Sequence, residues 1–148
     1  MASESKKIHG SCVEIEGLGV LLCGPPGSGK SDLTLRLIDG GARLIADDYT
    51  ELTPRDGRLH AQAPESIKGL LEVRGVGMLE VGSALRVELG VVIDLVESDA
   101  VERLPEDATK EILGVDVASF TLAPFEASAP AKVRLIARRV KGDIRHVP

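Results

Sequence analysis

One segment of eight residues constrains the fold of this chain more than any other. Residues 24–31 read Gly-Pro-Pro-Gly-Ser-Gly-Lys-Ser and fit the pattern G-x-x-x-x-G-K-[ST] at every fixed position. The continuous apolar run Leu18–Cys23 precedes this segment, as expected of a buried strand. Residues 32–39 follow it with apolar residues at helical spacing, and two glycines then end the pattern as a helix C-cap would. A strand, a glycine-rich loop and a helix in this order predict an α/β fold that binds phosphate groups.

The residue types in this loop suit a nucleotide. Glycines allow backbone N–H groups to turn towards phosphate oxygens, and the following helix adds the positive end of its dipole. The lysine supplies a charge for the β and γ phosphates, and the last serine is placed to bind Mg²⁺. We therefore expect ATP or GTP to be bound by Gly24, Pro25, Pro26, Gly27, Ser28, Gly29, Lys30 and Ser31.

Composition excludes several other classes of protein. A chain of 148 residues with 43% hydrophobic residues is typical of one globular domain. Its net charge of −5 supplies no excess of positive charge for nucleic acid or an anionic membrane. No apolar run reaches the roughly 20 residues of a membrane helix, and the first residues lack the apolar part of a signal peptide. We expect a cytoplasmic protein with reduced cysteines, in which residues 1–148 form one domain and residues 1–7 a flexible leader.

The remaining pattern is rich in strands and has few helices. Alternating or continuous apolar residues predict strands over 11–16, Arg43–Ala46, Leu70–Val73, 78–81, 85–95 and 117–122. Pro54, Asp56 and Gly57 indicate the turn of a hairpin. A short helix is predicted over residues 109–113, and a longer one begins near Ser128.

Acidic residues at three places are candidates to serve the bound phosphates. Asp47 and Asp48 end the strand after the loop helix, so they should lie beside the loop at the carboxyl edge of the sheet. Asp94 ends another apolar strand and is a rival metal ligand. Glu72 and Arg74 are two residues apart on a strand and face the same side. Their spacing is equally compatible with an exposed ion pair and with a metal ligand beside a charge-stabilising arginine.

Four strings in the sequence match those of one known family. They are His9-Gly10, GPPGSGKS with its helix, LIADD at 44–48 and LLEVRGVGM at 70–78. Through them the chain resembles the catalytic domain of the bacterial HPr kinase/phosphorylase family, over about residues 8–140. The resemblance implies a P-loop kinase core of the phosphoenolpyruvate carboxykinase-like type, a cytoplasmic location and a homo-oligomer. It also implies that the N-terminal domain of longer members is absent.

The resemblance further implies a role for individual residues. His9 matches the catalytic histidine, and Asp48 matches the aspartate that takes the proton of the substrate serine. Lys30 matches the lysine that contacts the nucleotide, Arg74 lies within the signature sequence, and Arg103 matches a further catalytic arginine.

For the metal, Ser31 matches one Mg²⁺ ligand and Glu72 the second, and we assign Asp47 to the same site. These roles agree with the needs of phosphoryl transfer, which depends on positioning, a base and charge neutralisation.

The implied reaction is phosphorylation of a serine of an HPr-like phosphocarrier of the phosphotransferase system, with ATP and Mg²⁺. The family's Pro-Val-Arg-Pro-Gly-Arg-Asn-like stretch, which is associated with the phosphorylase direction, is replaced here by LAPFEA at 122–127. We therefore expect a kinase whose phosphorylase activity is weak or absent. The alternatives are a small-molecule P-loop kinase or NTPase that uses Asp94, and a non-catalytic nucleotide sensor with a basic C-terminal segment.

Overall fold

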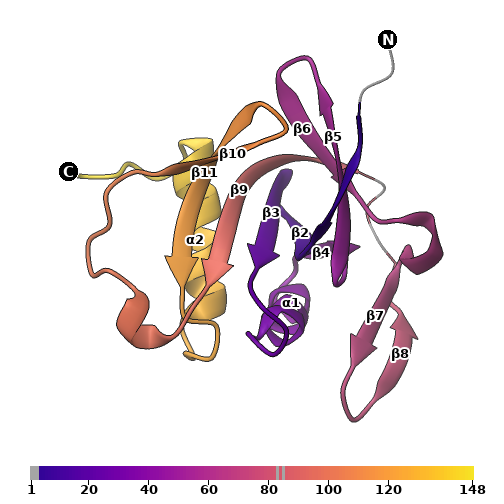
Figure 1. Cartoon of the computed structure of the whole chain (residues 1–148). Helices are drawn as coiled ribbons and strands as arrows, with labels where there is room; N and C mark the ends of the chain where they lie inside the picture. The colour runs from indigo at the N-terminus through magenta and orange to yellow at the C-terminus, as the bar shows by residue number, and fades with distance from the viewer. Residues whose placement is uncertain (1–3, 83, 85) are drawn as a thin grey trace.

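The described residues of the computed structural model, 4–82, 84 and 86–148, form a strand-rich α/β fold with two α-helices (Figure 1). Along this part of the chain the elements are β1 (Lys6–His9), β2 (Ser11–Ile15), β3 (Leu18–Cys23), α1 (Lys30–Asp39), β4 (Arg43–Ala46), β5 (Tyr49–Arg55), β6 (Arg58–Gln62), η1 (Glu65–Ile67), β7 (Leu70–Val73), β8 (Gly77–Glu80), β9 (Val87–Leu95), η2 (Ser98–Ala100), β10 (Thr109–Ile112), β11 (Val115–Leu122) and α2 (Ala129–Lys141). None of these helices is long and apolar enough to cross a membrane.

Parallel strands β3 and β9 lie at the centre of the main sheet. Strand β9 pairs with β11 on its other side, and β2 lies antiparallel between β3 and β4. The strands β4, β3, β9 and β11 therefore run in the same direction, and their carboxyl ends lie at one edge. The start of β9 also pairs with β6, through which the sheet continues into β5 and β1.

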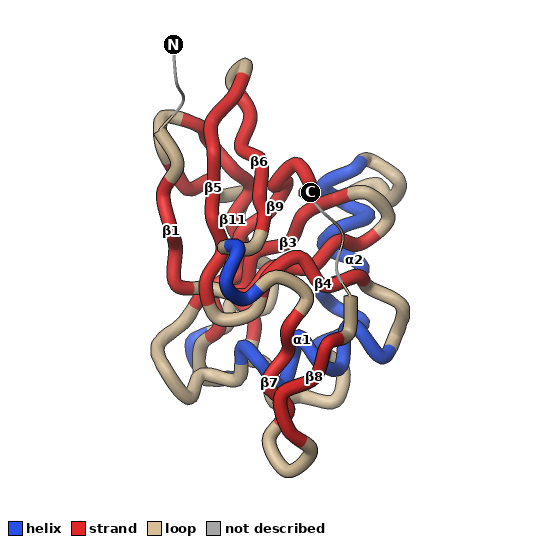
Figure 2. Tube along the Cα trace, turned by 90° about the vertical axis from the view of Figure 1, so that its right-hand side faces the viewer, coloured by secondary structure: helices blue, strands red, loops and turns tan. Residues whose placement is uncertain are grey.

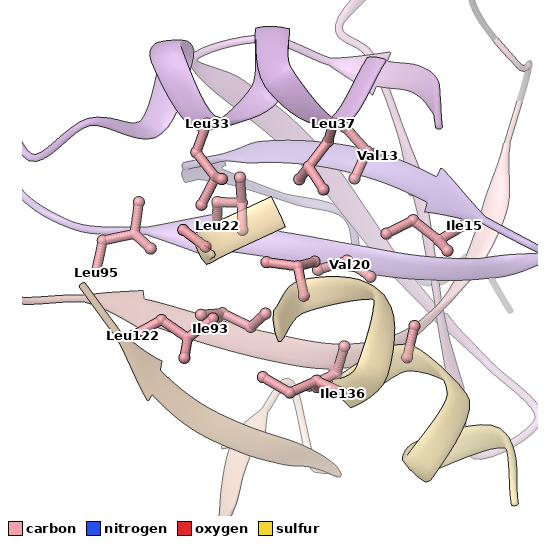
Figure 3. Packing of buried hydrophobic residues seen from close by; sticks show 14 residues of the cluster. Val13, Ile15, Val20, Leu22, Leu33, Leu37, Ile93, Leu95, Leu122 and Ile136 are labelled. Atoms are coloured by element: carbon pink, nitrogen blue, oxygen red, sulfur yellow. The ribbon is translucent and has the colours of Figure 1, made fainter. Parts of the chain in front are cut away.

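Both helices cover one face of this sheet. Leu33 and Leu37 of α1 point towards Val20 and Leu22 of β3, and Ile136 of α2 packs on the same face (Figure 3). All five side chains are buried, so this packing holds the start of α1 at the end of β3. The loop between these two elements is consequently anchored at both of its ends.

The opposite face of the sheet packs against the β5–β6 hairpin. Leu21 of β3 and Val92 of β9 share a buried cluster there with Leu52 and Leu59. Successive residues of β3 thus enter different cores, since side chains alternate across a strand. This explains why a strand that is buried on both faces has a continuous apolar sequence.

Several predicted elements are confirmed. The strands at Leu18–Cys23, Arg43–Ala46 and Leu70–Val73 have the predicted bounds. The hairpin turn is formed by Asp56 and Gly57, both with positive φ, between β5 and β6. The strand predicted over 85–95 is observed as Val87–Leu95, and its first predicted residue, Leu85, lies outside the described residues.

Two predictions are wrong. Residues 109–113 do not form a helix, because β10 pairs antiparallel with β11 through a turn at Leu113 and Gly114, which both have positive φ. The predicted leader of residues 1–7 does not include Lys6 and Lys7, which belong to β1 and pair with β5. In both places the structure is decided by hydrogen bonds to a later strand, β11 in the first case and β5 in the second.

Hairpin β7–β8 forms a small sheet of its own (Figure 2). It projects from the end of the molecule at which α1 lies. Exposed apolar side chains occupy this hairpin, including Val76 and Met78.

Candidate active site

The phosphate loop, residues 24–31, connects β3 to α1. Lys30 is the first residue of α1 and is buried. Its Nζ donates hydrogen bonds to the carbonyl oxygens of Gly24 at 2.6 Å and Pro25 at 3.1 Å. The ammonium group therefore lies within the loop, where bound phosphate groups would exchange these contacts for stronger charged ones.

Gly29 lies where the loop meets the segment that follows β11. Its φ of 99° is in the left-handed region, and a Cβ here would lie 2.9 Å from both Phe125 Cζ and Pro124 Cγ. Arg36 of α1 holds this segment by donating to the carbonyl oxygens of Pro124 and Glu126. The segment is thus packed directly against the phosphate loop.

This packing predicts that Gly29→Ala is more destabilising than a glycine replacement that strains only the backbone. The matched control is Gly57→Ala, where φ is 76° and a Cβ would meet nothing within 4 Å. The control should lower the free energy of unfolding by about 1 kcal/mol. Gly29→Ala should lower it further because of the added steric contact. Urea denaturation of both variants measures the difference, and equal losses would contradict the packing argument.

Asp47 is buried beneath the cavity, immediately after β4. Its Oδ1 accepts hydrogen bonds from Ser11 Oγ at 3.1 Å and Ser31 Oγ at 3.3 Å. Its Oδ2 accepts a longer one from the Glu72 N–H at 3.5 Å. Burial raises the pKa of Asp47, and the hydrogen bonds from Ser11, Glu72 and Ser31 oppose that rise. The fold thus brings the side chains of Ser31 and Asp47 together, whereas Glu72 contacts Asp47 through its backbone N–H.

A pH dependence of stability follows from the burial of Asp47. Because the pKa of Asp47 is raised above the ordinary 3.8, the folded chain holds the proton of this carboxyl group more tightly than the unfolded chain does. The resulting stabilisation is present below about pH 4 and is lost as the pH rises through the raised pKa. Asp47→Asn does not titrate, so its Tm relative to that of the wild type should increase from pH 4 to pH 7.

Thermal unfolding of the ligand-free proteins at several pH values measures this difference. Asp56→Asn, at an exposed turn where the residue already has positive φ, controls for the loss of one negative charge. Equal changes in the two variants would contradict the role of burial at Asp47.

Asp48 differs from its neighbour in direction and exposure. Its φ is 70°, and 59% of its side chain is exposed, so the carboxylate faces the cavity. His9 Nε2 lies 3.0 Å from Asp48 Oδ1 and donates to it when that nitrogen is protonated. Ser11 Oγ accepts the N–H of Asp48 at 3.0 Å, and the Asp48 carbonyl accepts the Gly10 N–H at 2.8 Å. These bonds orient the carboxylate beside the phosphate loop.

One cavity of about 540 Å³ lies over the loop. It is lined by His9, Pro26, Gly27, Gly29, Lys30, Ser31, Asp32, Leu35, Asp48, Glu72, Val73, Arg74 and Phe125. Predicted catalytic and metal residues from β1, α1 and hairpin β7–β8 therefore share this space. Among the ion pairs of the described residues, none joins Glu72 to Arg74.

Six candidates do not line this cavity. Gly24, Pro25 and Ser28 lie within the loop, and Asp47 bonds to Ser31. Arg103 is exposed in the segment between η2 and β10. Asp94 is the second-last residue of β9, and its Oδ1 lies 3.5 Å from Nζ of Lys110 in β10, with which it forms an ion pair. The carboxylate that the alternative hypothesis requires is therefore paired outside the cavity.

The chain is similar to proteins of known family and fold. The family model described as HPr Serine kinase C-terminal domain matches residues 1–133. The chain belongs to this family. The HPr kinase/phosphorylase of Bordetella pertussis is 37% identical over 122 residues, which cover 74% of this chain and 40% of that protein. The protein of the same name from Malacoplasma penetrans is 38% identical over 127 residues, or 78% of this chain and 42% of that protein.

The fold of this chain is also that of a solved relative. The HPr(Ser) kinase/phosphatase of Coxiella burnetii has a TM-score of 0.82 and 25% identity, covering 93% of this chain and 92% of that one. The strand-rich α/β P-loop architecture is thus confirmed. The chain spans about 40% of the length of the curated relatives that it matches.

The kinase family uses nucleotide, and the oxygen donors here suit a magnesium ion that arrives with it. No group of three His, Cys, Asp or Glu side chains in the described part of the chain forms a site of its own. Mg²⁺ usually takes only one or two carboxylates and completes its shell with phosphate oxygens and water. The juxtaposed oxygens of Ser31 and Asp47 fit that demand, and Glu72, whose backbone N–H bonds to Asp47, lines the same cavity as Ser31.

Sequence reasoning missed three residues of this site. Ser11 bonds to both Asp47 and Asp48, Arg36 holds the segment beside the loop, and Phe125 lines the cavity. The position of Ser11 directly after the His9-Gly10 string is a signal that could have indicated it. Nothing in the local sequence indicates that residues 36 and 125 lie near the phosphate loop.

Proposed function

We propose that this chain transfers the γ phosphate of ATP to a serine hydroxyl of an HPr-like phosphocarrier protein. The observation that carries the proposal is the division of the two adjacent aspartates. Asp47 is buried against Ser31, whereas Asp48 faces the cavity and contacts His9. One carboxylate is thus suited to a metal ion and the other to the proton of an acceptor.

In the proposed reaction the serine oxygen attacks the γ phosphorus of ATP. Asp48 takes the serine proton, a new P–O bond forms, and the bond from the γ phosphorus to the β–γ bridging oxygen breaks to release ADP. His9 orients the Asp48 carboxylate through the 3.0 Å contact. Lys30 and Arg74 offset the negative charge of the phosphates.

Magnesium would be held by Ser31, Asp47 and Glu72 together with phosphate oxygens. When bound, it supplies neutralisation of the charge on the transferring group.

Intact-mass spectrometry tests this function directly. A purified HPr-like phosphocarrier, incubated with the chain, ATP and Mg²⁺, should gain one phosphate group on a serine. Lys30→Ala should remove the gain, because the charge within the loop is lost. A chain that binds ATP but leaves the phosphocarrier unchanged would contradict the proposal and favour a nucleotide sensor.

We further propose that the reverse, phosphorylase direction is weak or absent. Residues 122–127 lack the arginines of the family's stretch, and their Pro124 and Phe125 lie against Gly29. This segment therefore brings no cationic side chain to hold an attacking inorganic phosphate. Phosphorylated substrate incubated with phosphate should release little pyrophosphate, and rapid release would contradict this part of the proposal.

A further inference from the structure

Phe125 is an exposed aromatic residue at the edge of the cavity. It is 70% exposed and lines the cavity over the phosphate loop. Aromatic residues are scarce in this chain, which has two Phe, one Tyr and no Trp. The other phenylalanine, Phe120, is half-buried beneath the Arg139 guanidinium at 5.2 Å. An exposed phenyl ring is unfavourable in water, so a ring left open over a binding cavity indicates a ligand surface.

The ring is held in place before any ligand binds. The ring atom Cζ lies 2.9 Å from the position that a Cβ of Gly29 would take. Arg36 fixes the backbone on both sides of the ring through the carbonyl oxygens of Pro124 and Glu126. A side chain positioned in this way loses little conformational freedom on binding.

The order of the strands places Phe125 and Asp48 on opposite sides of the phosphate loop. The loop follows β3, Asp48 follows β4, and Phe125 follows β11. Across the sheet the order is β4, β2, β3, β9, β11, so β4 and β11 each lie two strands away from β3. With a spacing of about 4.8 Å between strands, the ends of β4 and β11 each lie roughly 10 Å from the end of β3. The Phe125 ring reaches back from the end of β11 to Gly29. A nucleotide whose γ phosphate lies near Asp48 would extend across the loop towards Phe125.

We propose that Phe125 is the stacking platform for the nucleobase. This inference rests on the proposed function, because the direction of the nucleotide is taken from the transfer of its γ phosphate at Asp48. Lys30 and the loop then bind the phosphates, while the phenyl ring binds the base. Stacking on an aromatic ring needs no hydrogen-bond match, since every base has a π face.

Comparing a ligand that has a base with one that lacks it tests the platform. Phe125→Ala should weaken ATP binding about tenfold, as expected from loss of one base–aromatic stack. The same variant should bind inorganic tripolyphosphate within about twofold of wild type, because that ligand has no base. Isothermal titration calorimetry measures both affinities. Leu135→Ala, which removes a 51%-exposed apolar side chain from α2 outside the cavity, is the matched control.

Phe125→Trp provides an independent readout because the chain has no other tryptophan. Its fluorescence should be quenched by ATP and not by tripolyphosphate, and its ATP affinity should be retained. Unchanged ATP affinity in Phe125→Ala, or equal losses for ATP and tripolyphosphate, would overturn the platform alone. A wild-type chain that binds neither ligand would overturn the proposed function and the platform with it.

Discussion

Replacing Asp48 by Asn is expected to slow phosphoryl transfer to serine by roughly 10²- to 10⁴-fold, the range typical of a lost general base. The amide cannot take the serine proton, although its oxygen can still accept the hydrogen bond from His9. Asparagine also tolerates the left-handed backbone that Asp48 adopts at φ 70°. ATP affinity should therefore stay within about twofold of wild type. Mass spectrometry of the phosphocarrier over time and calorimetry with ATP measure the two quantities.

Asp94→Asn is the matched control for this experiment. Asp94 is paired with Lys110 and does not line the cavity, so its replacement should change the transfer rate by less than about threefold. The opposite pattern, with Asp94→Asn inactive and Asp48→Asn active, would contradict the assignment of Asp48. It would favour a small-molecule P-loop kinase that uses Asp94.

Ile93→Ala is expected to lower the free energy of unfolding by about 2–5 kcal/mol. Ile93 is fully buried in the core between the sheet and the two helices, on the strand between β3 and β11. Truncation removes buried apolar surface and leaves a cavity that close-packed neighbours fill only in part. For a domain of this size the Tm should fall by roughly 10 °C. Differential scanning calorimetry and urea denaturation measure the loss.

An exposed leucine supplies the comparison for Ile93. Leu104 is 80% exposed, so Leu104→Ala should change stability by no more than about 0.5 kcal/mol. If the two variants lost similar amounts of stability, the core described around β3 and β9 would be wrong.

Local sequence alone determined the strand, the phosphate loop and the helix around which this fold is built. The apolar run Leu18–Cys23, the glycine-rich loop and the helix that follows are set by neighbouring residues, and their predicted positions agree with the structure. Asp47 and Asp48, predicted to lie beside the loop because they end the strand after the loop helix, also lie there in the structure. These features were predictable because burial on both faces, the conformation of glycine and helix periodicity all act over a few residues.

Tertiary structure decided what depends on contacts between distant residues. Residues 109–112 are a strand because they pair with β11, which is itself paired with the distant β9. Lys6 and Lys7 are a strand because they pair with β5. The difference between buried Asp47 and exposed Asp48 depends on Ser11, Ser31 and Glu72 closing around one carboxylate. The position of residue 125 over Gly29 depends on β11 lying two strands from β3. Local propensity cannot specify such contacts, because the energy that favours them is gained only when the separate segments pack together.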